Sequence, residues 1–66
     1  MMNYSNSQIE FLINEYIHSE RDRKILKRRL IDGITFEALA EEFELSARHV
    51  KTIVYKSENI LFKKIP

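Results

Sequence analysis

The 66-residue sequence has no cysteine, one glycine and one proline, which is its last residue. The lack of cysteine excludes a disulfide framework and a zinc finger, and it makes a reducing cytoplasm the expected location. The scarcity of glycine and proline favours helices with short connections over strands. The sequence also lacks the apolar run of a signal peptide or of a membrane span, so we expect no membrane contact. These absences predict a small all-α protein.

Charge is segregated along the chain, although the formal net charge is only +1. Residues 1–20 carry glutamates as their only charged residues, and residues 21–29 carry six bases against a single acid. Residues 37–44 carry four glutamates and no base, whereas residues 46–57 carry bases and no acid. Local fields would therefore select the partners of this protein. The basic run at 21–29 is either a solvated helix face or a phosphate-contacting surface, and the sequence leaves both open.

Start signals and the helical spacing of apolar residues predict two helices in the first half. Ser7 and Glu10 have the spacing of a capping box ahead of a helix over residues 8–18. Ser19 repeats the start signal ahead of a helix over residues 20–31. The inward positions are Ile9, Leu12, Ile13, Tyr16 and Ile17 in the first helix, and Ile25, Leu26, Leu30 and the alkyl stem of Arg29 in the second.

The second half has the same kind of signals for two more helices. Thr35 caps a helix over residues 36–43. Ser46 caps the last helix, which begins at the residue after this serine. Gly33 suits the left-handed position that ends the preceding helix. Glu44 stands where a glycine is usual, which predicts a looser or differently wound turn. The inward positions of the last helix are Val50, Ile53, Val54 and Leu61, with Ile60 and Ile65 as further candidates.

These elements predict one small bundle of three to four helices, a single domain over residues 1–66. Residues 57–59 interrupt the apolar pattern of the last helix and leave a kink or a separate short final helix open. A chain this short buries a smaller share of its surface than a large domain, so its core is marginal. The expected core centres on Val50, together with Leu26, Leu30, Leu39 and Ile53.

Residues 35–56 form the candidate functional stretch. With the apolar residues inward, the last helix presents an outward stripe at positions i, i+3, i+4 and i+7. Two short helices that share a core, with a cationic stripe on the second, are typical of a helix-turn-helix. Such a motif lays its second helix, here residues 46–56, in the DNA major groove. The stripe consists of Arg48, Lys51, Thr52 and Tyr55.

Residues 21–56 resemble the fourth region of the sigma-70 family of bacterial transcription initiation factors. The shared features are a basic helix, a hydrophobic-Asp-Gly break and a threonine that opens the next helix. They continue with Leu-Ala-Glu-Glu, and with Leu-Ser before a second basic helix. In this chain they are Ile31, Asp32, Gly33, Thr35, Leu39, Ala40, Glu41, Glu42, Leu45, Ser46, Val50 and Ile53. The resemblance implies a small stand-alone helix-turn-helix protein of the kind found in phages and mobile elements of Gram-positive bacteria.

The resemblance also implies which residues contact DNA. It assigns base reading to Ala47, Arg48, Lys51 and Thr52, of which Arg48 and Lys51 are the natural guanine readers. Sigma factors commonly carry Arg-Glu where this chain has Ala47 and Arg48, so recognition of the usual upstream promoter hexamer is not implied. The expected phosphate contacts are Arg28, Arg29, Thr35, Ser46, His49, Tyr55 and Lys56.

We expect neither an enzyme, nor a cofactor, nor a metal site. His18 and His49 are predicted on different elements with no third ligand at metal spacing. Glu41 and Glu42 are adjacent, so they point in different directions from a helix and cannot share an acid–base site. The sequence has no glycine-rich phosphate loop and no nucleophile motif.

The sequence thus predicts a DNA-binding transcriptional regulator whose main partner is double-stranded DNA. The resemblance leaves open a contact with RNA polymerase. Because a single small module rarely binds DNA tightly alone, we also expect a homodimer or a polymerase complex. It would form through the first or last helix, with Phe11 or Phe62 at the contact. The alternative is a protein-interaction module that binds RNA polymerase or another transcription factor without reading DNA.

Overall fold

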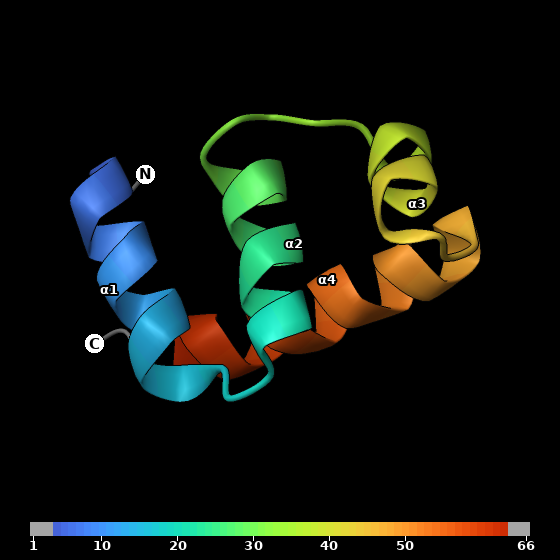
Figure 1. Ribbon diagram of the computed structural model, residues 1–66. Helices are drawn as coiled ribbons and strands as arrows, with labels where there is room; N and C mark the ends of the chain where they lie inside the picture. Colours follow the sequence, from blue (N-terminus) through green and yellow to red (C-terminus); the bar gives the residue numbers. More distant parts are fainter. Residues whose placement is uncertain (1–3, 64–66) are drawn as a thin grey trace.

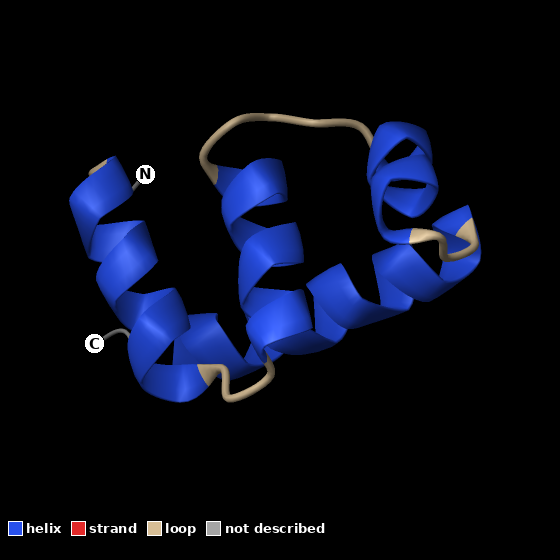
Figure 2. Cartoon of the chain, viewed as in Figure 1, coloured by secondary structure: helices blue, strands red, loops and turns tan. Residues whose placement is uncertain are grey.

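The computed structural model describes residues 4–63, which form four helices with short connections (Figure 1). Figure 2 shows helices and loops, and no strand, within that range. The predicted all-α bundle is therefore confirmed. Ile65, a candidate inward residue, lies outside the described residues. The helices are α1 Asn6–Tyr16, α2 Glu20–Leu30, α3 Phe36–Phe43 and α4 Ala47–Lys63.

The long helix α4 organises the arrangement, because it contacts each of the other three helices. Figure 1 shows α1, α2 and α3 standing side by side across α4, with α3 over its beginning and α1 over its end. Helix α2 lies between them and contacts both α1 and α3. The described chain measures 33 × 20 × 19 Å along its principal axes.

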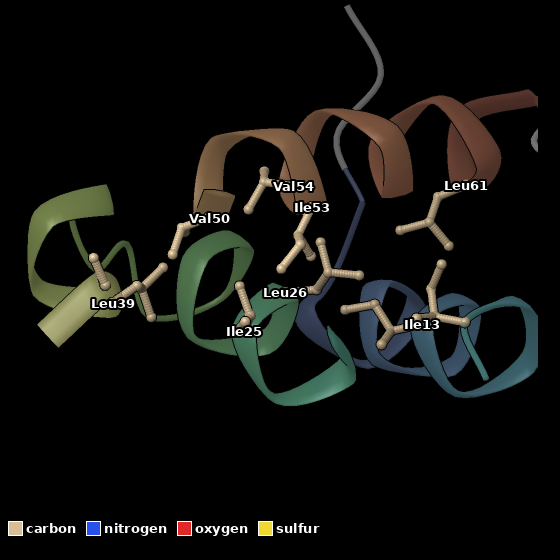
Figure 3. Packing of buried hydrophobic residues seen from close by; sticks show 10 residues of the cluster. Ile13, Ile25, Leu26, Leu39, Val50, Ile53, Val54 and Leu61 are labelled. Carbon is tan, nitrogen blue, oxygen red and sulfur yellow. The ribbon is translucent and has the colours of Figure 1, made fainter. Parts of the chain in front are cut away.

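The core follows α4 from end to end (Figure 3). Val50, Leu26 and Leu39 have no exposed surface. Ile53 is buried as well, so the predicted centre is confirmed for these four residues. Leu30 is only half-buried, because it is the last residue of α2 and packs at the edge of the core. The buried apolar residues are Ile13, Ile17, Ile25, Leu26, Leu39, Ala40, Val50, Ile53, Val54 and Leu61.

Helix α1 begins and ends about two residues earlier than predicted. Its N-cap is Ser5, whose hydroxyl accepts from the Gln8 N–H at 3.2 Å. The Gln8 side-chain oxygen in turn accepts from the Ser5 N–H at 2.8 Å. The prediction of Ser7 as the cap was wrong because the same Ser-x-x-polar spacing occurs two residues earlier. Starting there adds another helical hydrogen bond, from the Ile9 N–H to the Ser5 carbonyl at 3.0 Å.

Arg23 of α2 secures the end of α1. Its guanidinium donates to the Asn14 carbonyl at 3.1 Å and also to the Ile17 carbonyl. The last carbonyls of a helix have no partner within the helix, so a cation from a neighbouring helix satisfies them. Ile17 leaves the helix in an extended conformation and remains buried. One member of the basic run at 21–29 therefore has a structural partner.

The boundaries of the other helices agree with those predicted from the sequence. Ser19 caps α2 through the Asp22 N–H at 3.3 Å, as predicted. Gly33 has a φ of 71°, which is the left-handed conformation expected of it. Helix α4 continues through residues 57–59 without a break, because Ser57 is small and lies buried on the core face beside Val54. Along residues 4–63 no helix is long and apolar enough to cross a membrane.

The turn between α3 and α4 has the winding that a glycine would give it. Glu44 has φ 56° and ψ 45°, in the left-handed region. Its N–H reaches the Glu41 carbonyl at 3.4 Å, and the Leu45 N–H donates to the Ala40 carbonyl at 2.8 Å. The predicted looser turn was wrong, since the hydrogen bonds and the packing around Leu45 hold the glutamate in this conformation.

Glu44→Gly is therefore expected to stabilise the protein. A left-handed non-glycine residue costs about 1–2 kcal/mol, of which the greater chain entropy of glycine offsets roughly 0.5–1 kcal/mol. A net gain of about 0.5–1 kcal/mol raises the melting temperature of a domain this size by several degrees. Glu44→Ala is the control, because it removes the same carboxylate but keeps the Cβ. Equal melting temperatures for the two variants would contradict the left-handed conformation of Glu44.

Candidate nucleic-acid interface

Two hydroxyl caps define the helix-turn-helix formed by α3 and α4. Thr35 accepts from the Ala38 N–H at 3.1 Å at the start of α3. Ser46 accepts from the His49 N–H at 3.0 Å at the start of α4. Both caps are exposed, as the predicted phosphate contacts require. Free N–H groups at a helix start are a ready position for an anion.

The predicted stripe lies on the exposed face of α4. Arg48, Lys51, Thr52 and Tyr55 are all exposed, whereas Val50 on the opposite face is buried. Within residues 4–63 no ion pair restrains the guanidinium of Arg48 or the ammonium of Lys51. The Thr52 hydroxyl donates to the Arg48 carbonyl at 3.0 Å, so its oxygen remains available as an acceptor. The stripe is thus an exposed surface with hydrogen-bonding groups.

Ala47, the fourth predicted base reader, differs from the stripe residues. It is half-buried and packs against the core at the first turn of α4. Only part of its methyl group faces outward, so its contribution to an interface is limited to a small apolar contact.

Phe36 brings cations from two helices together at one edge of the stripe. The Cζ atom of Arg29 lies 4.1 Å from the centre of its ring, and the Nζ atom of Lys51 lies 5.8 Å from it. The Tyr55 ring meets it edge-on, with the centroids 5.8 Å apart and an interplanar angle of 73°. Sequence reasoning treated Phe36 only as an inward apolar residue. Its neighbours come from α2 and α4, so no local signal identifies the cluster.

Arg28 and Arg29 have partners within the protein. The guanidinium of Arg28 binds the Glu42 carboxylate with two hydrogen bonds, at 2.7 and 3.2 Å, and lies 3.5 Å from Asp32. The hydrogen bond to Glu42, followed by its charge, raises the pKa of Arg28. Arg29 donates to the Ile34 carbonyl at 3.0 Å. A phosphate would have to compete with these partners, and both residues remain only predicted contacts.

The remaining predicted phosphate contacts lie along α4. Tyr55 is 57% exposed beside Phe36, on the flank that faces α3. His49 and Lys56 are exposed on the other flank, where a groove of about 370 Å³ separates α4 from the α1–α2 connection. His18 of that connection lines the same groove. Within the described part of the chain, no three His, Asp or Glu side chains are placed to hold a metal ion.

The chain matches no protein-family model, no curated protein and no solved structure. The candidate site is therefore defined by its own geometry. It consists of an exposed cationic stripe on α4, two hydroxyl-capped helix starts and a groove on the flank away from α3.

Proposed function

We propose that this protein is a sequence-specific DNA-binding transcriptional regulator that inserts residues 46–56 of α4 into the major groove. The observation that carries the proposal is the exposed stripe of α4, which has no acidic residue among its neighbours from 46 to 57. A helix about 10–12 Å across fits a major groove about 12 Å wide. The stripe carries hydrogen-bond donors, and the edges of the bases in the major groove carry acceptors for them.

Within this proposal, the stripe residues have distinct roles. Arg48 and Lys51 are one turn apart and donate to guanine O6 and N7, the acceptors that cations read most often. Thr52 contacts a thymine methyl group or a phosphate, and Ala47 adds a small apolar contact. Residues at the ends and flanks of the motif meet the sugar–phosphate backbone and fix the register of α4. These residues are Thr35, Ser46, His49, Tyr55 and Lys56.

The resemblance of residues 21–56 to the fourth region of sigma-70 family factors supports a role in transcription. It favours a small stand-alone protein of phage or mobile-element type that acts in the cytoplasm without catalysis. Ala47 and Arg48 depart from the usual Arg-Glu pair, so we propose a DNA target different from the upstream promoter hexamer. The partners are double-stranded DNA and, as the resemblance allows, RNA polymerase.

Selection from a pool of random duplexes tests sequence specificity. We expect one short motif to be enriched, and the selected duplex to bind at least tenfold more tightly than a scrambled one at the same salt concentration. Specific protein–DNA pairs usually exceed this ratio by a wide margin. Binding without any enriched motif would overturn the specific reading of bases. No binding at all would favour the alternative, a protein-interaction module that contacts RNA polymerase or another factor.

Exposed aromatic residues on α1 and α4 support an assembly of more than one chain. Phe11 is 63% exposed on α1, and Phe62 is 52% exposed near the end of α4. Single modules rarely bind DNA strongly, so we propose a homodimer or a polymerase complex formed through one of these surfaces. Sedimentation of the protein with and without duplex checks this. A strict monomer that binds a single site tightly would contradict it.

Phe36→Leu is expected to weaken DNA binding while preserving the fold. Leucine keeps the apolar contact at the start of α3, but it removes the ring that Lys51 and Arg29 approach. Exposed cation–π contacts are worth about 0.5–1 kcal/mol each, so losing the two that position the stripe should lower the affinity by at most about 5- to 30-fold. Phe36→Tyr is the control, since it keeps the ring. An unchanged affinity for Phe36→Leu would show that the ring does not position the stripe.

A further inference from the structure

The groove between α4 and the α1–α2 connection collects basic residues from distant parts of the sequence. His18 and Arg21 line one wall, and His49 and Lys56 of α4 line the other. The one acidic residue in the lining is Asp22, whose carboxylate accepts from the Arg21 Nε at 3.2 Å. The groove therefore combines the Arg21–Asp22 ion pair with the ammonium group of Lys56 and two imidazole side chains.

The groove adjoins the proposed recognition surface. Thr52 belongs to the exposed stripe of α4 and also lines the groove. On the opposite flank of α4 lies α3, where Phe36 contacts Lys51 and Tyr55. The stripe is thus bordered by α3 on one side and by the groove on the other.

A helix in the major groove has a sugar–phosphate strand on each side, because the DNA groove is scarcely wider than the helix. Thr35, at the start of α3, is expected to contact the phosphates of one of these strands. We expect the second strand to pass along the other flank of α4, where this groove opens. Basic side chains and helix-flanking hydroxyls are the usual ligands of backbone phosphates.

We propose that this groove binds a phosphate group of the second DNA strand, through His18, Arg21, His49 and Lys56. The proposal rests on the proposed function and extends its interface to the α1–α2 connection, which lies outside the helix-turn-helix. The ligand is a phosphate anion, either in the backbone of a duplex or free in solution. Two sets of measurements separate these sources.

The first measurement compares two double variants in duplex binding at two salt concentrations. His18→Ala with Arg21→Ala removes two lining residues, both exposed, so the fold should be retained. Lys24→Ala with Lys27→Ala is the control, because both lysines lie on α2, as Arg21 does, but line a different pocket, beside Phe43. It removes two formal positive charges against one, so a general electrostatic effect would make its loss the larger. We expect the first variant to lose about 5- to 30-fold on selected and scrambled duplexes alike. Its salt dependence should flatten by about one unit of slope.

A loss for the lysine variant as large as or larger than that of the His18–Arg21 variant would overturn the groove as a site, because the effect would then come from the general positive field. The melting temperature of each variant, measured alongside, separates a lost contact from lost structure. If the His18–Arg21 variant does not fold, Arg21→Gln alone serves in its place with the same expected direction.

The second measurement follows the imidazole NMR signals of His18 and His49 in the unaltered protein. We expect both to shift together on addition of inorganic phosphate, and also on addition of duplex. Duplex binding that leaves both signals unmoved would overturn the groove while the proposed function stands. Saturable shifts with phosphate but no duplex binding would keep the anion site and reject the proposed function. Unmoved signals on both additions, together with no duplex binding, would reject both.

Discussion

Val50→Asp is expected to unfold the protein. Val50 has no exposed surface and lies where α4 crosses α2 and α3, next to Leu39 in Figure 3. A carboxylate there would lose its water without gaining a partner, at a cost of several kcal/mol. A folded domain has roughly 0.05–0.15 kcal/mol of stability per residue, so a chain of 66 residues has little more than this to lose.

Circular dichroism and thermal melting of the variant check this result. Thr52→Asp is the control, because it places the same carboxylate on the exposed face of the same helix. The control should melt close to the unaltered protein, whereas Val50→Asp should show little helix. If Val50→Asp kept its helical signal and melting temperature, the helical phase of α4 would be wrong. The conclusion that Arg48 and Lys51 face outward would then be wrong as well.

Arg48→Ala is expected to weaken binding to the preferred duplex by about 5- to 150-fold and to change random-duplex binding little. Arg48 is the first residue of the stripe and is exposed, and a bidentate contact of its guanidinium with guanine is worth about 1–3 kcal/mol of discrimination. Since the wrong base offers no such contact, the loss should be confined to the preferred sequence.

Lys56→Ala is the matched comparison, because Lys56 lies on the flank of α4 and is proposed to contact phosphate. It should weaken preferred and random duplexes alike and flatten the salt dependence by about one unit of slope. An equal loss on both duplexes for Arg48→Ala would make Arg48 a phosphate contact instead of a base reader. Unchanged binding for both variants, with the fold intact, would favour the protein-interaction module.

Local signals in the sequence were enough to predict the helix-turn-helix. Thr35 and Ser46 each bond an N–H three residues ahead, and a cap of this kind depends on nearby residues alone. The stripe on α4 follows from the same local pattern, since the apolar positions fix which face is buried. The start of α1 was missed because Ser5 and Ser7 both satisfy the local rule. Only the hydrogen bonds of the folded chain distinguish them.

Contacts between distant residues were beyond prediction from one sequence. Arg28 and Glu42 belong to segments that looked like separate basic and acidic surfaces, yet they form an ion pair at 2.7 Å. Likewise, the groove places His18 near the flank of α4 that carries His49. Both juxtapositions depend on how α2 packs between its neighbours, and the periodicity of a single helix carries no information on that packing. Arg28 is therefore the least available of the predicted phosphate contacts.

The most direct test is the salt dependence of duplex binding by the unaltered protein. A cationic stripe and groove that neutralise several phosphates should release counterions, each phosphate contributing about −0.9 to the slope of log affinity against log salt. We expect measurable binding at low salt and a slope of roughly −2 to −4. Absence of duplex binding at about 50 mM salt, with the helical fold intact, would contradict the proposal that α4 is a DNA-recognition helix.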